Sequence, residues 1–166
     1  MSVNIALLTV TDTRTFETDK SGNILVEKIK KAKHNLVERK ICKDNKEDIK
    51  IILKEWTHKK DLDVVITTGG TGLTGRDITP EALDEIADKH IPGFGEIFRY
   101  LSLQTVGTSS IQSRACAVLS NGKYIFALPG SSGGVIDAWD KILVHQLDIN
   151  HKPCNFVELF PRLKEK

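Results

Sequence analysis

The sequence has 166 residues, 40% of them hydrophobic, which matches one domain with a core large enough to exclude intrinsic disorder. Its 24 Lys and Arg residues nearly balance its 22 Asp and Glu residues, so it lacks the cationic excess of a generic nucleic-acid-binding protein. No apolar run approaches the roughly 20 residues that span a bilayer. We therefore expect a soluble, cytoplasmic single domain over residues 1–166, without nucleic-acid or membrane partners.

The first predicted elements are a buried strand, a helix and a second strand. Residues 4–10 are almost continuously apolar, which is typical of a strand that is covered on both faces of a parallel sheet. After a polar loop, Leu25, Ile29 and Ala32 recur at i, i+4 and i+7, as one buried helix face requires. Residues 36–42 then have the pattern of a strand.

The most regular helix pattern follows this second strand. Asn45 is suited to be its N-cap, with acidic residues in the first turn. Residues 62–68 form a third strand, rich in β-branched residues, that runs directly into a glycine cluster. The order up to this point is β-α-β-α-β. In the helix that begins after Asn45, the apolar residues are spaced i, i+3, i+4 and i+7: Ile49, Ile52, Leu53 and Trp56.

Beyond the glycine cluster, Thr79 and Pro80 predict an N-cap followed by proline at the first helical position. Pro92-Gly93 interrupts the chain before a further helical pattern over residues 94–101. An Asn-Gly dipeptide at 121–122 predicts a hairpin, because a type I′ turn needs positive φ at both central residues. A closing helix follows the last strand, with Ser131 or Ser132 as its cap.

These elements predict a three-layer α/β/α sandwich, in which helices cover both faces of a mostly parallel, mixed sheet. Residues 148–166 form a C-terminal tail with one apolar cluster at 156–160. The cysteines and histidines lack the spacing of metal ligands, and three distant cysteines do not predict a disulfide framework. In sheets of this kind, ligands bind at the carboxyl ends of the strands.

The glycine cluster lies at such a strand end. Gly69, Gly70, Gly72 and Gly75 fall within seven residues, which favours a backbone that turns sharply and presents amide groups to an anion. The alternative is a tight turn that serves shape alone. The formal G-x-G-x-x-G match at 70–75 does not fit a dinucleotide site, since it follows the third strand and lies well before the next helix. A P-loop would need lysine and Ser or Thr where Arg76-Asp77 stands.

Two acids are expected at the same edge of the sheet. Asp77 follows the glycines, and a carboxylate ~4 Å from a phosphate is repelled by roughly 4 kcal/mol at an effective dielectric of about 20. Mg²⁺ bridging the two groups would reverse that sign. Asp44, after the second strand, is the second candidate ligand. A helix-flanking acid and an ordinary cap are the structural alternatives. Asp12 and the turn at 129–134 would help to frame a phosphate-bearing ligand.

Five ordered motifs carry a resemblance to a known family. They read TTGGTG at 67–72, GRDITPEAL at 75–83, PGFGEIFRYLS at 92–102, QSRA at 112–115 and ALPGSSGG at 127–134. With these motifs the chain resembles the molybdopterin-binding proteins of molybdenum cofactor biosynthesis, most closely the protein B branch. The resemblance extends from Leu7 through the closing helix. One departure is that a single basic residue, Arg76, precedes Asp77, where the related Mog branch tends to carry two.

The resemblance implies a Rossmann-like molybdopterin-binding fold that assembles as a trimer or a dimer of trimers. It also implies Mg²⁺-dependent transfer of AMP from ATP to the molybdopterin phosphate, with Asp44 and Asp77 as metal-associated carboxylates. A non-catalytic molybdopterin carrier, or a vestigial pocket, remains an alternative, and a molybdenum insertion protein is a possible partner. The residues that would shape the nucleotide and pterin pockets, besides Asp12, are Gly69, Gly70, Thr71, Gly72, Gly93, Phe94, Gly95, Glu96, Ser113, Arg114, Pro129, Gly130 and Ser131.

Overall fold

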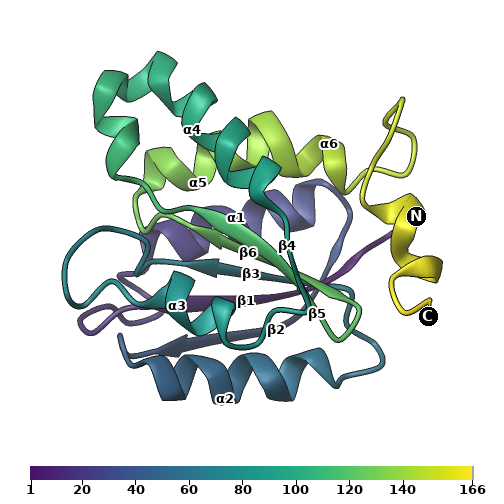
Figure 1. Ribbon diagram of the computed structural model, residues 1–166, viewed down its shortest axis with the longest axis horizontal. Coiled ribbons are helices and arrows are strands. Elements are labelled where there is room, and N and C mark those ends of the chain that lie inside the picture. The colour runs from purple at the N-terminus through teal and green to yellow at the C-terminus, as the bar shows by residue number, and fades with distance from the viewer. Residues whose placement is uncertain (166) are drawn as a thin grey trace.

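A computed structural model describes residues 1–165. At its centre is a six-stranded sheet in the order β2-β1-β3-β6-β5-β4 (Figure 1). The first four of these strands are parallel, β5 runs antiparallel to β6, and β4 runs antiparallel to β5. The bounds are β1 Asn4–Val10, β2 Asn35–Cys42, β3 Val64–Thr68, β4 Lys89–His90, β5 Cys116–Ser120 and β6 Lys123–Leu128.

Helices cover both faces of the sheet, so the predicted three-layer architecture is confirmed (Figure 1). One face carries α1 (Lys20–Lys31), α4 (Pro92–Val106), α5 (Ser132–Ala138) and α6 (Val144–Gln146). The other face carries α2 (Lys46–Thr57) and α3 (Thr79–Asp84). A π-helical turn, Trp139–Leu143, joins α5 to α6, and 3-10 segments occupy Gly107–Gln112 and Val157–Arg162.

Two separate cores explain why β1 is apolar at nearly every position. Ile5 and Leu7 pack into the core beneath α1, α4 and α5. Ala6 and Leu8, which point the opposite way because side chains alternate along a strand, pack against α2 and α3. A strand buried on both faces needs apolar residues at odd and even positions alike.

Local sequence signals correctly predicted two helix caps and the hairpin turn. The side chain of Asn45 accepts hydrogen bonds from the amides of residues 47 and 48, and Ser131 accepts one from Gly134 at 3.1 Å. Asn121 and Gly122 have φ values of 47° and 70°, as the predicted hairpin turn requires. The prediction for Thr79 was wrong, because the residue before it occupies the N-cap position of α3 without a side-chain cap.

Three features were not predicted. Strand β4 has only two residues, too few for a periodic pattern, and the π-helical turn has no simple sequence signal. The tail also packs onto the core beneath α1, α4 and α5. There the centroid of the Phe156 ring lies 4.7 Å from that of Tyr124 and 5.6 Å from that of Phe126. Within residues 1–165, no helix combines the length and apolarity needed to cross a membrane.

Candidate functional site

A cavity of about 490 Å³ opens at the carboxyl ends of β1, β3 and β6. It brings together two candidate acids, the first glycines of the cluster and the turn after β6, although these segments are far apart in the sequence. This arrangement follows from the parallel strands, whose carboxyl ends share one edge. The lining residues are Val10, Thr11, Asp44, Gly69, Gly70, Thr71, Gly72, Asp77, Gln112, Ser113, Pro129, Gly130 and Ser131.

The glycines allow the loop after β3 to pass close to the neighbouring strand ends. Gly69 has a φ of 103°, and a Cβ atom on it would lie 2.2 Å from the carbonyl oxygen of Val10. Gly70 has a φ of 66°. Within residues 1–165, the amides of Gly70 and Thr71 donate to no protein acceptor. Amides of this kind, in a backbone with positive φ, are suited to bind an anion.

Asp77 is held in place by its own loop. Its Oδ2 atom accepts hydrogen bonds from the Thr74 amide at 2.9 Å and from the Thr74 hydroxyl at 2.7 Å. Burial raises the pKa of Asp77, but these bonds, with a contribution from the Gly72 amide, outweigh it and hold the pKa below its usual value. Asp77 is therefore an ionised, oriented carboxylate at neutral pH.

Asp44 lies in the same cavity under different electrostatic conditions. Burial and the negative charge of Asp77 both raise its pKa. Its backbone amide donates to Asp12 at 3.2 Å, and Asp12 also forms an ion pair with Arg76. Asp12 thus ties the segment that carries Asp44 to the glycine cluster, while Arg76 is engaged by a carboxylate.

The two carboxylates suit a hard divalent cation that completes its coordination elsewhere. The charge of Asp77 raises the cost of ionising Asp44, and a cation between the two carboxylates would relieve that repulsion. In the part of the chain that the structure describes, no group of three or more His, Cys, Asp or Glu residues could hold a metal ion. The remaining ligands would have to be water and phosphate oxygens, as is common for Mg²⁺.

Asp44→Asn is expected to raise stability slightly at pH 7. Because the folded state raises the pKa of Asp44, its charged form disfavours folding above that pKa, and the penalty disappears as pH falls and the acid is protonated. Asparagine removes the charge but keeps the shape. We expect thermal unfolding to show a Tm increase of about 1–3 °C at pH 7 that shrinks toward pH 4. A lower Tm at pH 7 would contradict this account.

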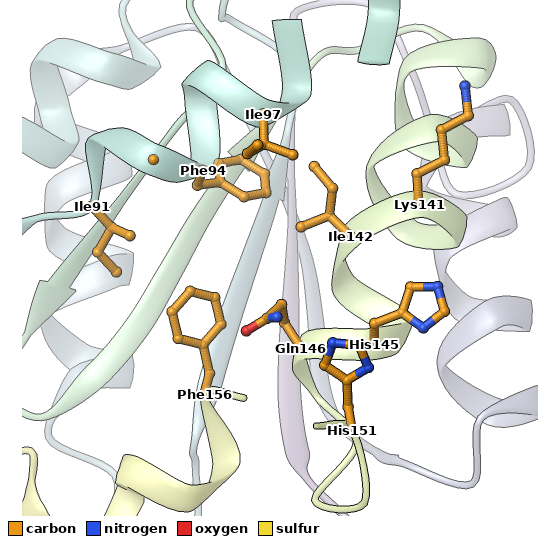
Figure 2. A pocket seen from close by; sticks show the side chains of 10 residues that line it. Ile91, Phe94, Ile97, Lys141, Ile142, His145, Gln146, His151 and Phe156 are labelled. Atoms are coloured by element: carbon orange, nitrogen blue, oxygen red, sulfur yellow. The ribbon is translucent and has the colours of Figure 1, made fainter. Parts of the chain in front are cut away.

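Other residues named from the motifs lie outside this cavity. Gly93 and Phe94 line a separate, mainly apolar cavity of about 410 Å³, surrounded by α4, the segment around Ile142 and Phe156 of the tail (Figure 2). Phe94 is only 4% exposed. Gly95, Glu96 and Arg114 line a third cavity, also of about 490 Å³. Among residues 1–165, Ser113 alone lines both this third cavity and the first.

Two further hollows adjoin the first cavity. A polar one of about 250 Å³ shares Gly69, Gly130 and Ser131 with it and adds the cationic residues Arg14 and Lys20. A larger, mainly apolar groove of about 630 Å³ shares Ser113, Pro129 and Ser131 and extends between α4 and α5. The edge of the sheet therefore has room for an elongated ligand that extends from the glycines into the neighbouring hollows.

Several residues at this edge were not predicted from the sequence. Thr74 stands three residues before Asp77, a spacing that favours local side-chain hydrogen bonds and was a usable signal. Gln112 belongs to the QSRA motif but was not named as a site residue. Arg14 and Lys20 gave no signal, because their places depend on how loops distant in the sequence converge. The polar hollow also lies next to Asp19, which is buried and caps α1.

Comparisons with known proteins agree with the fold and with the motifs. Residues 6–149 match the family model described as "Probable molybdopterin binding domain". Molybdenum cofactor biosynthesis protein B of Escherichia coli (strain K12) is 44% identical over 161 residues, which cover 97% of this chain and 93% of that protein.

Solved structures give the same result. A crystal structure of a molybdenum cofactor biosynthesis protein B has a TM-score of 0.89 at 41% identity and covers 100% of this chain and 98% of its own. The tungsten cofactor synthesizing protein MoaB from Pyrococcus furiosus has a TM-score of 0.76 at 36% identity, with 86% of this chain and 91% of that chain covered. From its motifs, its fold and these similarities, the chain belongs to the molybdopterin-binding domain family of molybdenum cofactor biosynthesis proteins.

Proposed function

We propose that the chain transfers AMP from ATP to the terminal phosphate of molybdopterin, as one step of molybdenum cofactor biosynthesis. The observation that carries the proposal is the cavity lined by Asp44 and Asp77 together with Gly70 and Thr71, whose amides donate to no acceptor within residues 1–165. Amides favour phosphate and carboxylates favour a cation, so the arrangement suits a ligand that brings both, as Mg²⁺-bound ATP does.

The reaction requires no nucleophile from the protein. A phosphate oxygen of molybdopterin attacks the α-phosphorus of ATP, the new P–O bond forms, and the bond to the bridging oxygen of the β-phosphate breaks to release pyrophosphate. Asp44 and Asp77 would hold Mg²⁺, whose positive charge offsets repulsion among the phosphates. The amides of Gly70 and Thr71 would bind a phosphate oxygen and align the reacting groups, so catalysis would consist mainly of positioning and charge stabilisation.

Pyrophosphate release tests the proposal directly. The purified protein is incubated with molybdopterin, ATP and Mg²⁺, and each component is omitted in turn. Pyrophosphate and an adenylylated molybdopterin are expected only in the complete mixture. Pyrophosphate without molybdopterin would indicate simple hydrolysis of ATP, and no product in any mixture would contradict the proposal.

A non-catalytic molybdopterin carrier is the second candidate. The observation that favours it is that Arg76, the single basic residue before Asp77, pairs with Asp12 instead of standing free for phosphate. A phosphate site with one cation fewer binds nucleotide more weakly. Calorimetry separates the two functions, because a carrier would bind molybdopterin but neither bind ATP nor form an adenylylated product.

We also propose that the protein assembles as a trimer or a dimer of trimers through α4. Four apolar side chains of this helix are exposed at three-residue intervals, a pattern that single surface residues do not produce. A second copy of the chain would remove this stripe from water. The stripe consists of Ile97, Tyr100, Leu103 and Val106.

Tyr100→Glu combined with Leu103→Glu is expected to lower the molecular mass in solution to that of the monomer. Both changes place a carboxylate within the stripe, where burial against another copy would be costly. Light scattering after size-exclusion chromatography measures the mass. Ile51→Glu on α2 is the matched control, because Ile51 is 64% exposed, as Tyr100 is, but lies on the other face of the sheet. An unchanged mass in the double variant would exclude α4 as the interface.

A further inference from the structure

We propose that Arg114 and Glu81 form a positioning pair that holds the main chain of the glycine loop, residues 69–78, at Gly72 and at Asp77. The motif containing Arg114 suggested a residue that touches the ligand. Arg114 instead forms its hydrogen bonds within the protein, with the loop that carries Asp77. The functional part of the proposal rests on the proposed adenylyl transfer, whereas the structural part does not.

Arg114 contacts the loop at three carbonyl groups. Its backbone amide donates to Thr71 at 2.9 Å. Its Nε donates to the carbonyl of Gly72 at 2.7 Å, and its Nη2 donates to the carbonyl of Asp77 at 2.6 Å. The side chain therefore spans the loop from the glycines to the acid, with a planar, forked donor set that fits several acceptors at once.

Glu81 on α3 holds the guanidinium from the other side. Its carboxylate bonds to Nη1 and, at 3.3 Å, to Nη2, so all three guanidinium nitrogens are engaged by protein groups. The bond from Arg114 is also the main reason that the pKa of Glu81 lies below its usual value. Glu81 therefore remains charged at neutral pH and keeps the fork in one orientation.

The carbonyl groups of the loop determine where its amides point. In a trans peptide group the C=O and N–H bonds point in opposite directions. The carbonyls of Gly69 and Gly70 accept hydrogen bonds from Thr79, which turns the amides of Gly70 and Thr71 away from α3. The carbonyl of Thr71 accepts from Arg114, which directs the amide of Gly72 away from β5 in the same manner.

The pair therefore supports one of the two features on which the candidate site depends, the placement of Asp77. Thr79 holds the peptide groups of the free amides, whereas the side chain of Arg114 holds the carbonyls of Gly72 and Asp77, so the pair fixes the main chain on both sides of the segment that leads to the Asp77 carboxylate. A direct ligand contact by Arg114 makes a different prediction. In that case Glu81 would compete with the ligand for the guanidinium, and neutralising Glu81 would leave binding unchanged or tighten it.

Glu81→Gln and Arg114→Gln distinguish the two roles. Calorimetry measures the binding of Mg²⁺-ATP, and hydrogen exchange measures protection of the amides in residues 69–78. Both variants are expected to exchange faster in this loop and to bind Mg²⁺-ATP about 10- to 100-fold more weakly, as is typical when partners that orient a ligand are removed. The double variant should be no worse than the weaker-binding single one, because both changes break the same contacts.

Arg114→Lys adds a test by partial rescue. Lysine keeps the charge and can pair with Glu81, but one ammonium group cannot reproduce the fork, so binding and loop protection should fall between those of wild type and Arg114→Gln. If Arg114→Gln fails to fold, this variant and Glu81→Gln decide the question. Lys59→Gln is the control, since it breaks a partly exposed ion pair with Glu38 away from the loop.

The proposal is overturned if Glu81→Gln binds Mg²⁺-ATP as tightly as wild type or more tightly while Arg114→Gln does not. It is also overturned if loop exchange is unchanged in both variants. Should wild type bind no Mg²⁺-ATP, the proposed function fails, but faster exchange of residues 69–78 in both variants would still establish the positioning pair.

Discussion

Asp77→Asn is expected to reduce molybdopterin-dependent pyrophosphate release by about 10²- to 10³-fold, the usual effect of removing one preorganised charge-stabilising group. The asparagine oxygen can still accept the hydrogen bonds from Thr74, so the loop keeps its shape. What is lost is the negative charge that would hold Mg²⁺ beside the phosphates. Initial rates at saturating ATP and Mg²⁺ measure the effect.

The control for this variant is Asp61→Asn, which removes an exposed carboxylate outside the site. Asp61→Asn should unfold within about 2 °C of wild type, because exposed surface changes stay within roughly 0.5 kcal/mol. Asp77→Asn should be less stable than wild type at pH 7 but still folded, because the folded state lowers the pKa of Asp77 and its charged form therefore favours folding. Near-normal turnover of Asp77→Asn would contradict the proposed metal-binding role of this residue. Turnover lost together with the folded state would show that the asparagine had disturbed the loop itself.

Gly69→Ala is expected to destabilise the protein by about 2–5 kcal/mol. The left-handed backbone at Gly69 costs a residue with a side chain about 1–2 kcal/mol, and displacing a packed neighbour costs about 1–3 kcal/mol more. The neighbour is the carbonyl of Val10, which belongs to a buried central strand and cannot rotate away as a side chain would. Urea unfolding measures the free energy of unfolding.

Gly75→Ala is the matched control in the same loop. A Cβ atom there would meet no other atom within 4 Å, and no positive φ opposes it. Its stability should lie within about 0.5 kcal/mol of wild type. Equal effects of the two substitutions would mean that the glycines serve only general loop flexibility. A large loss confined to Gly69→Ala would mean that close packing of strand ends requires this residue.

The layers of the fold were predictable because their signals are local and periodic. The alternation of buried strands with amphipathic helices gave the architecture, and Asn45 and the Asn-Gly turn gave their local conformations. Thr79 shows the limit of such signals. Its sequence context favours a helix cap, but its hydroxyl donates 2.9 Å to the carbonyl of Gly69, ten residues earlier. A tertiary contact thus replaced the local one.

The site was predictable to the extent that it follows from topology. The glycine cluster, Asp44 and the turn after β6 follow parallel strands, so a common edge brought them together. The partner of Arg114 did not follow from this rule, because Glu81 lies 33 residues away on a helix and resembles any solvated helical glutamate. For the tail, the sequence likewise predicted an apolar cluster but not its packing against Tyr124.

The direction of β5 determines which residues can reach the edge where the candidate site lies. If β5 were parallel to its neighbours, Arg114 would enter the sheet at the opposite end, on the far side of the core from the glycines. The antiparallel hairpin reverses this strand, so that Cys116 pairs with Ala127 and the segment just before β5 meets the segment just after β6. A strand reversal therefore lets residues that precede a strand act beside residues that follow one, which doubly wound sheets with only parallel strands do not permit.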